Sequence, residues 1–453
     1  MLRNFFQDKE FTRTMFKLAF PLMLQQVLQS SLSFIDMVMI GQLGDIPVAG
    51  IGLGNQVFFL VHLLSFGIGS ATAMFTAQFW GSRDIESIRK SLGIGLVLSA
   101  AGGFLFSIVA ILIPEEVLGI YSTDAAVVLA GSEYLRIVGL SFVFSSTAFI
   151  FIAVLRSVGN VRLPMAVSVL ALGLNTLLNY ALIFGNFGFP ALGVRGAGIA
   201  TCIALLLEFI CMIAAVYLFR TPIAAKFSEI FSFDRLFLKK FLRTAIPVIV
   251  SEMLWAFGTT IYYVVYARIG TQAIVAINIS ASIEQLGFVI FIGLAHACAI
   301  MVGNRIGAKE TGKAFQYALN FIVIGLAGSV VMSILIVLIT SPVLNLYKIS
   351  SVSREYVGNI LRIFAFILWL RASNIIIFIG ILRSGGDTRF AFIADAIAVW
   401  LIGIPLAFLG GFVLHLQIHW VYLLIMSEEL IKFIVVMRRF LSKKWINDLT
   451  QIG

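Results

Sequence analysis

Long apolar stretches, separated by short polar breaks, fill the chain from residue 16 to residue 437. A helix that crosses a bilayer needs about 20 predominantly apolar residues. The stretches that reach this length are 16–41, 48–79, 91–113, 131–155, 164–186, 196–219, 244–267, 273–302, 317–341, 356–382, 390–411 and 418–437. The pattern predicts an all-α integral membrane protein with twelve transmembrane helices.

The two halves of the chain repeat each other. Residues 19–44 align without a gap on residues 245–270 at an offset of 226, which places Pro21 on Pro247. The sequence LRSxGxxR also occurs in both halves, 227 residues apart. Because each half holds six spans, both have the same orientation. The repeat predicts two six-helix lobes related by a pseudo-twofold axis along the membrane normal, with a substrate site in the cleft between them.

The polar breaks divide the chain into four parts. Residues 1–219 form the expected N-lobe with spans one to six, and residues 244–437 form the C-lobe with spans seven to twelve. Residues 220–243 are the one long polar connection and are expected to be a cytoplasmic loop. Residues 438–453 are expected to be a cytoplasmic tail.

The distribution of charge predicts the orientation. Charged residues make up only 12% of the chain, against about 25% in soluble domains. Lys and Arg number 24 in the segments expected inside the cell and 6 in those expected outside. This positive-inside asymmetry predicts a multi-pass protein of the cell (plasma) membrane with both termini in the cytoplasm. The net charge of +10 then faces anionic lipid and indicates no nucleic-acid partner.

Sequence motifs argue against several other classes. The chain has no HExxH, GxSxG or Walker lysine motif, so neither an enzyme nor an ATP-driven pump is expected. Its cysteines, Cys202, Cys211 and Cys298, lie in apolar runs and indicate no disulfide or metal framework. No cofactor is expected besides a coupling ion.

Polar residues at similar depth mark a candidate site in the N-lobe. Inserting an ionisable side chain into the membrane costs about 2.5–3.5 kcal/mol on insertion scales, so each such residue is expected to have a structural or functional role. Asp36 is the only acid of the first span. Asn175 and Asn179 lie one helical turn apart on one face of the fifth span, and Thr201 lies at comparable depth in the sixth.

The C-lobe has its own candidates, Glu252, Glu284 and Arg371, all near mid-depth. One interpretation is a cation site. The other is a structural ion pair of Arg371 with Glu252 or Glu284, which would leave no vacant sodium site because a resident cation occupies it. The sequence leaves both open.

Other charges in the spans have simpler explanations. Glu208, in the middle of the sixth span, is expected either to have a structural role or to face the cleft. Asp395 lies near the inner end of the eleventh and is expected to reach the interface. Glu428 and Glu429 precede Lys432 at helical spacing, which predicts local ion pairs.

Several motifs together resemble the multidrug and toxic compound extrusion (MATE) family over nearly the whole chain. They are FIDMVMIGQLG (34–44), PALGVRGAGIAT (190–201), IEQLGFVIFIGLAHACAIMVGNRIGAKE (283–310), the repeated LRSxGxxR and WLIGIPLAFLG (400–410). The resemblance implies a secondary active antiporter that exports amphipathic organic cations in exchange for H⁺ or Na⁺, by rocking two lobes. The implied partners are small organic cations and the lipid bilayer, and the chain is expected to act as a monomer.

The resemblance also implies roles for particular residues. It places a cation or proton site, with Na⁺ as one candidate, on Asp36, Asn175, Asn179 and Thr201. Some relatives have an acid where this chain has Asn179, so proton coupling and a weaker sodium site both stay open.

In the C-lobe the resemblance covers two positions. Glu252 matches a glutamate of the sodium-coupled branch, and Glu284 matches one common in the eighth span. The acid that this branch has in the tenth span is missing, because the chain reads Arg371-Ala-Ser-Asn374 there.

Asp36 offers a simple exchange mechanism. An apolar cavity favours the protonated, neutral carboxyl, whereas an organic cation or Na⁺ favours the ionised form. Two ligands that compete for one carboxylate weaken each other's binding, and antiport follows. The alternative is a flippase for lipids or lipid-linked oligosaccharides, which would need a cationic cavity. The charges expected to point inward are chiefly acidic.

Overall fold

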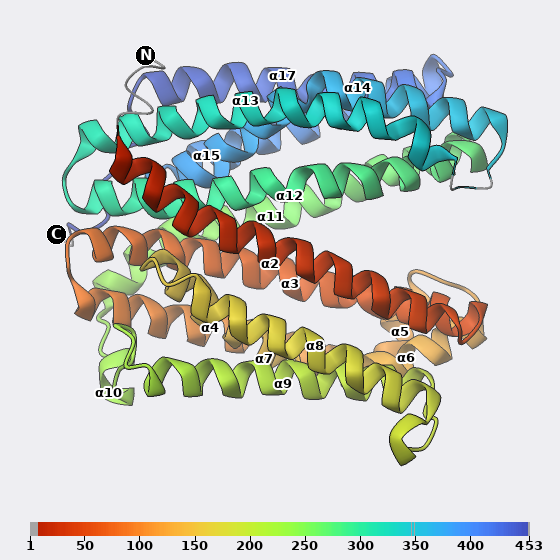
Figure 1. The fold of residues 1–453 in the computed structure, drawn as a ribbon, viewed down its shortest axis with the longest axis horizontal. Coiled ribbons are helices and arrows are strands. Elements are labelled where there is room, and N and C mark those ends of the chain that lie inside the picture. Colours follow the sequence, from red (N-terminus) through yellow and green to blue (C-terminus); the bar gives the residue numbers. More distant parts are fainter. Residues whose placement is uncertain (1–7, 346, 348, 452–453) are drawn as a thin grey trace. The chain divides into compact units, whose positions relative to one another are not determined.

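The computed structural model describes residues 8–345, 347 and 349–451, and every regular element in this part of the chain is a helix (Figure 1). Ten of the helices are long and apolar enough to cross a membrane. An eleventh crossing results if α6 (Ala125–Gly139) and α7 (Phe142–Ser157), which meet at 53°, form one span. The last predicted span coincides with α17 (Ile418–Leu441), which carries charged residues in its middle. Each predicted span thus coincides with a helix or with a run of consecutive helical elements.

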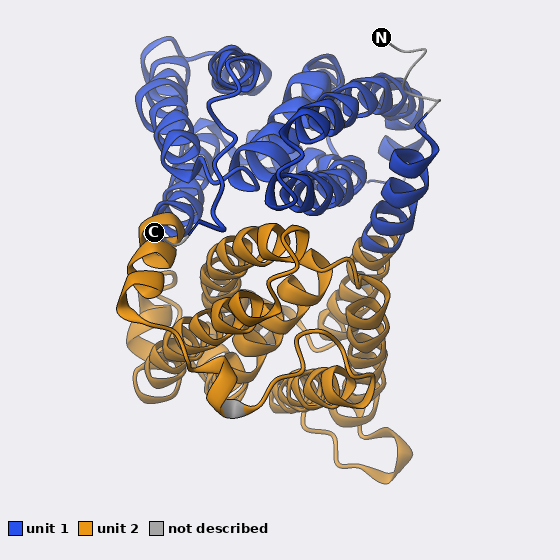
Figure 2. Ribbon diagram, turned by 90° about the vertical axis from the view of Figure 1, so that its left-hand side faces the viewer, with its two compact units in different colours: residues 1–23, 246–451, 453 blue, residues 24–245, 452 orange. Residues whose placement is uncertain are grey.

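The chain folds as two compact units (Figure 2). Residues 24–245, orange and keyed unit 2 in Figure 2, are called the first unit here because they come first in the chain. Residues 246–451 and the described residues before 24, blue and keyed unit 1, are called the second unit. The division falls within α2 (Lys9–Gly41), just after Pro21. The sequence pattern placed all of residues 1–219 in one lobe, but aromatic packing holds the start of α2 to the second half. The ring of Phe11 lies 5.0 Å from that of Tyr317 and 5.3 Å from that of Phe321.

The helices of the first unit, after the second part of α2, follow one another with short connections. They are α3 (Asp45–Gly81), α4 (Ile85–Leu112), α5 (Pro114–Gly119), α6, α7, α8 (Arg162–Phe184), η1 (Asn186–Gly188), α9 (Val194–Leu218) and α10 (Phe227–Ile230). The break between α6 and α7 interrupts the predicted fourth span. The hydroxyl of Ser107 donates to the backbone oxygen of Gly139 at 2.7 Å and so satisfies a carbonyl at the broken end.

A glycine brings α8 and α9 together. A Cβ at Gly196 would lie 2.4 Å from the backbone oxygen of Leu182, so only glycine permits this approach. The close packing places Thr201, just over a turn further along α9, beside the polar residues of α8. The glycine at position 196 thus allows Thr201 to lie at the site described below.

The second unit contains the remaining helices. They are α11 (Arg235–Ile269), assigned to this unit from residue 246, then α12 (Thr271–Gly307), α13 (Thr311–Leu344), α14 (Ser351–Ile375), η2 (Ile376–Arg383), α15 (Thr388–Ala396), η3 (Ile397–Gly403), α16 (Ile404–Phe408), η4 (Leu409–Val413) and α17. The elements η2, η3 and η4 are π-helical. Pro405 lies in the first turn of α16, between two of these wider segments, which accommodate its missing N–H.

The predicted polar connection and the predicted tail are both more ordered than the sequence indicates. In the connection, α10 forms a short helix, and α11 begins at Arg235, well before the expected start at 244. After α17, the side chain of Trp445 is fully buried, and the backbone N–H of Asn447 donates to Gly385 at 2.9 Å. The chain beyond residue 441 is therefore anchored to the second unit through the LRSxGxxR loop.

Candidate functional site

Asp36, on α2, accepts hydrogen bonds from three side chains of α8. Nδ2 of Asn179 lies 3.1 Å from its Oδ1, and the hydroxyl of Thr176 lies 3.3 Å from the same oxygen. The amide of Asn175 fits its neighbours best when its nitrogen faces Asp36, 2.8 Å from Oδ2. Both carboxylate oxygens are therefore solvated by fixed donors, which stabilise the ionised form in a half-buried setting.

Thr201 connects α9 to this group. In the same orientation of Asn175, its carbonyl oxygen accepts from the backbone N–H of Thr201 at 3.3 Å. The Thr201 hydroxyl donates to the backbone of Ala197 at 3.0 Å. The structure thus brings together the four N-lobe residues that the sequence singled out.

The carboxylate of Asp36 has no basic partner among the described residues. The only hydrogen-bonding atom of the group left over is Oδ1 of Asn179, which is buried and has no partner in the part of the chain that the structure describes. Asn179 itself is 3% exposed. An acidic side chain with donors but no counter-charge, beside a free acceptor, can bind a proton or a small cation.

Two contributors to this site were missed by the sequence analysis. Thr176 follows Asn175 directly and lies on the face of α8 that also carries Asn179, so its helical position was a usable signal. Tyr134 on α6 is 6% exposed and interacts with Thr201 and Asp36, and its hydroxyl donates to Oδ1 of Asn55 at 3.1 Å. No sequence pattern joins Tyr134 to Asn55.

In the second unit, Arg371 pairs with Glu284 rather than Glu252. Nη1 of Arg371 lies 2.7 Å from Oε2 of Glu284, and the hydroxyl of Tyr422 donates to Oε1 at 2.7 Å. The guanidinium also lies over the rings of Phe288 and Phe364, 4.6 and 5.3 Å from their centroids. This pair is fixed on both sides by packing and hydrogen bonds.

Glu252 belongs to a different pair. Its Oε1 lies 2.6 Å from Nη2 of Arg383, and their side chains are 11% and 12% exposed. Arg383 is the arginine of the second LRSxGxxR motif, where the sequence predicted a loop. The three C-lobe candidates therefore do not form one cluster, and each of the two glutamates already holds an arginine.

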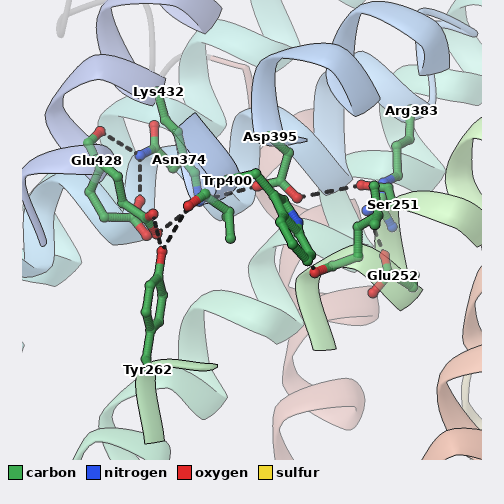
Figure 3. A network of polar contacts seen from close by, with 12 residues as sticks. Ser251, Glu252, Tyr262, Asn374, Arg383, Asp395, Trp400, Glu428 and Lys432 are labelled. Atoms are coloured by element: carbon green, nitrogen blue, oxygen red, sulfur yellow. Dashed lines mark hydrogen bonds and ion pairs between the residues drawn. The ribbon is translucent and has the colours of Figure 1, made fainter. Parts of the chain in front are cut away.

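Asp395, which was expected to reach the membrane interface, takes part in an ion pair. Its Oδ1 lies 3.1 Å from Nζ of the buried Lys432 on α17 (Figure 3). Lys432 also lies 3.3 Å from Oε1 of Glu428, the local pair that helical spacing predicts. The sequence analysis did not predict this contact, because α15 and α17 are not neighbours along the chain.

In the first unit, Glu208 accepts from the hydroxyl of Ser168 at 2.7 Å. Arg156, the arginine of the first LRSxGxxR motif, donates to Oε1 of Gln25 at 2.7 Å. The repeat thus places an arginine at the same position in both halves, but it faces a neutral amide in one and a carboxylate in the other. No group of three or more His, Cys, Asp or Glu that could hold a metal occurs within the described residues.

Long apolar helices in two units, with an uncompensated carboxylate inside one of them, define a multi-pass membrane transporter rather than an enzyme. A model of the MatE family matches residues 21–181 and, a second time, residues 247–409. The chain therefore belongs to the MatE family of transporters. The two matches also confirm the internal repeat.

Relatives cover nearly all of this chain. It is 27% identical to the uncharacterized transporter YisQ of Bacillus subtilis over 97% of this chain and 96% of that one. It is 27% identical to a probable multidrug resistance protein, NorM, of Bacillus anthracis over 89% and 88%. A third relative is the probable multidrug resistance protein NorM of Thermotoga maritima, 25% identical over 96% and 93%.

Solved structures show the same fold. A MOP superfamily transporter from Pyrococcus furiosus superposes with a TM-score of 0.86 at 21% identity, covering 95% of this chain and 96% of that one. A mutant form of the Vibrio cholerae MATE transporter VcmN superposes with a TM-score of 0.87 at 18% identity, covering 96% and 98%.

Proposed function

We propose that this protein is a secondary active efflux antiporter, which exports amphipathic organic cations in exchange for protons by alternating access, with Asp36 as the exchanging carboxylate. The observation that carries the proposal is the hydrogen-bonded but uncompensated charge of Asp36. An ionised carboxylate at membrane depth is costly without a counter-charge, so it gains most from binding a proton or a cation.

The exchange follows from competition for this carboxylate. With a proton on Asp36 the site is neutral and holds an organic cation weakly. Loss of the proton restores the negative charge and attracts the cation. By linkage, bound cation lowers the affinity for the proton by the same factor. Coupling therefore needs only one carboxylate that both ligands reach in turn.

The surroundings of Asp36 favour a proton over Na⁺. Two of the three groups that contact its oxygens are amide N–H donors, which do not coordinate a metal ion, and the third is the hydroxyl of Thr176. Sodium sites in transporters draw on backbone carbonyls freed where helices unwind, but α8 and α9 are continuous around Asn175, Asn179 and Thr201. If the amide of Asn179 rotates, its free Oδ1 can replace Nδ2 beside Asp36 and accept from a protonated carboxyl.

Two further observations support export of organic cations. NorM relatives are described as probable multidrug resistance proteins, which fits a transporter of xenobiotics. A flippase for phosphate-linked lipids would need unpaired basic groups inside the membrane. Arg371 and Arg383 are instead paired with Glu284 and Glu252, and Arg156 donates to the amide oxygen of Gln25.

The test is transport by the purified protein in liposomes. A proton gradient of the correct sign should drive uptake of ethidium, and Asp36→Asn should reduce the gradient-driven rate at least about tenfold, since it removes the only charge that exchanges. Glu116→Gln, which removes an exposed acid of α5, is the matched control and should transport normally. Gradient-driven uptake that survives Asp36→Asn, or that responds to Na⁺ alone, would contradict the proposal.

A further inference from the structure

Lys432 is the centre of a buried polar network that the proposed exchange at Asp36 does not use. Its ammonium lies between Asp395 of α15, at 3.1 Å, and Glu428 of α17, at 3.3 Å (Figure 3). Lys432 and Glu428 are each 5% exposed. The side chain of Asp395 is 18% exposed, so it is the member closest to the protein surface.

The network holds more acids than its single base can neutralise. Asp395 and Glu428 share the one ammonium of Lys432. Glu429, the next residue along α17, receives a hydrogen bond from Nδ2 of Asn374 at 2.6 Å and forms no ion pair within the described part of the chain. The arginines of this unit that lie inside the membrane bind elsewhere, Arg371 to Glu284 and Arg383 to Glu252.

Hydroxyl donors complete the network. The hydroxyl of Tyr262, on α11, donates to Oε2 of Glu428 at 2.6 Å, and that of Ser251 donates to Oδ2 of Asp395 at 3.4 Å. Tyr266, also on α11, is the remaining titratable neighbour of Tyr262. The donors stabilise both carboxylates as anions but add no charge, so the excess of negative charge remains.

The backbone is shaped to admit these side chains. A Cβ at Gly403 would lie 1.9 Å from the hydroxyl of Tyr262 and 2.2 Å from Oε2 of Glu428. The π-helical segment η3, which ends at Gly403, brings the carbonyl of Val399 within 3.4 Å of the same hydroxyl. The side-chain amide oxygen of Asn374, a residue 4% exposed, has no partner among the described residues. Such a site can accept one more donor.

We infer that Asp395, Glu428 and Lys432 form a second proton-binding site, separate from Asp36. A buried and a half-buried carboxylate beside one ammonium carry a net negative charge, and a shared proton neutralises it. In the protonated state, one carboxyl is neutral and Lys432 pairs with the other. On deprotonation the ammonium is shared by both, an arrangement that the distances of 3.1 and 3.3 Å allow. The proton passes between a carboxylate oxygen and water, and no other bond changes.

The inference goes beyond the proposed exchange and does not depend on it. If the site titrates while the transporter works, the protein carries one proton more than Asp36 alone can supply. If Asp36 is not the exchanging group, the site in the second unit still binds its proton. The two statements can therefore fail separately.

The test is infrared difference spectroscopy of the purified protein through a pH titration, in the carbonyl stretching region of protonated carboxyl groups. Wild type should show a titrating band that persists in Asp36→Asn. Asp395→Asn and Glu428→Gln should each abolish that band, because the remaining carboxylate then forms a neutral pair with Lys432. Glu429→Gln is the matched control on the same helix and should retain it.

In Lys432→Met the intensity of the carbonyl band should rise instead of falling. Because a loss of folding would not strengthen this band, the variant separates loss of the proton site from misfolding. Without the ammonium both carboxylates should take up protons, and the intensity of the band should rise about twofold. The inference is overturned if no titrating band remains in Asp36→Asn, if Asp395→Asn and Glu428→Gln both keep the band, or if Lys432→Met weakens it.

Discussion

Asn179 donates a hydrogen bond to Asp36 over 3.1 Å and so joins α8 to α2 across 143 residues of sequence. The bond fixes the carboxylate against a helix whose next turn carries Asn175. The second polar atom of the Asn179 amide, its oxygen, has no partner among the described residues. The hydrogen bond between Asn179 and Asp36 is the structural basis of the proposed exchange, and a single substitution at Asn179 can alter it.

Asn179→Asp places a second carboxylate within hydrogen-bond distance of the first. Two acids at this separation resist joint ionisation and share a proton. The pH at which proton-driven uptake is half-maximal should therefore move upward by about one unit or more. The pH profile of ethidium uptake in liposomes measures this shift. Asn186→Asp, at a residue whose amide bonds the backbone of Tyr180, is the control, and an unchanged profile for Asn179→Asp would refute the assigned contact.

Gly196→Ala should separate α8 from α9. Its new Cβ would meet the backbone oxygen of Leu182 at 2.4 Å, and overpacking of this kind costs about 1–3 kcal/mol. The melting temperature of the purified protein should fall, and uptake should fall with it because Thr201 moves away from Asn175. Gly173→Ala on α8 is the matched control, since a Cβ there meets nothing within 4 Å. Equal melting temperatures for the two variants would contradict the packing.

Arg371→Ala should be strongly destabilising, since it leaves Glu284 buried without its cation. Removing one partner of a buried pair costs about 3–5 kcal/mol. Thermal unfolding should show this loss, and Glu284→Gln in the same chain should recover part of it. Arg362→Ala, at an exposed position of the same helix, should change little. If Arg371→Ala melts like Arg362→Ala, the pair has no structural role.

Trp445→Ala should destabilise the second unit. Trp445 is fully buried, stacks on Phe440 with ring centroids 6.0 Å apart, and lies against Gly385. Truncation of such a side chain costs about 3–5 kcal/mol. Lys444→Ala, at the exposed neighbour, is the control. A melting temperature equal to that of the control would show that the segment after α17 is a free tail, as the sequence alone suggested.

The spans could be predicted from local spacing, and the grouping of Asp36 with Asn175, Asn179 and Thr201 could be predicted from matched depth together with the family resemblance. Apolar length marks each crossing helix, and a separation of four residues places Asn175 and Asn179 on one face of α8. The depth of Asp36 in its span then matches theirs. These signals need no knowledge of how helices pack.

What the sequence could not supply depends on contacts between distant elements. Arg383 looks like a loop residue, and only the approach of η2 to α11 pairs it with Glu252. Asp395 lies near an end of its span, yet it pairs with Lys432 on α17. The bend between α6 and α7 leaves no mark in hydropathy, since both sides of the break are apolar.

Proton release on substrate binding tests the central claim most directly. Tetraphenylphosphonium added to the purified protein in weakly buffered solution should displace about one proton per cation bound at a pH where Asp36 is protonated. The account predicts this release in wild type and in Glu116→Gln, and none in Asp36→Asn. A release from Asp36→Asn equal to that of wild type would contradict it.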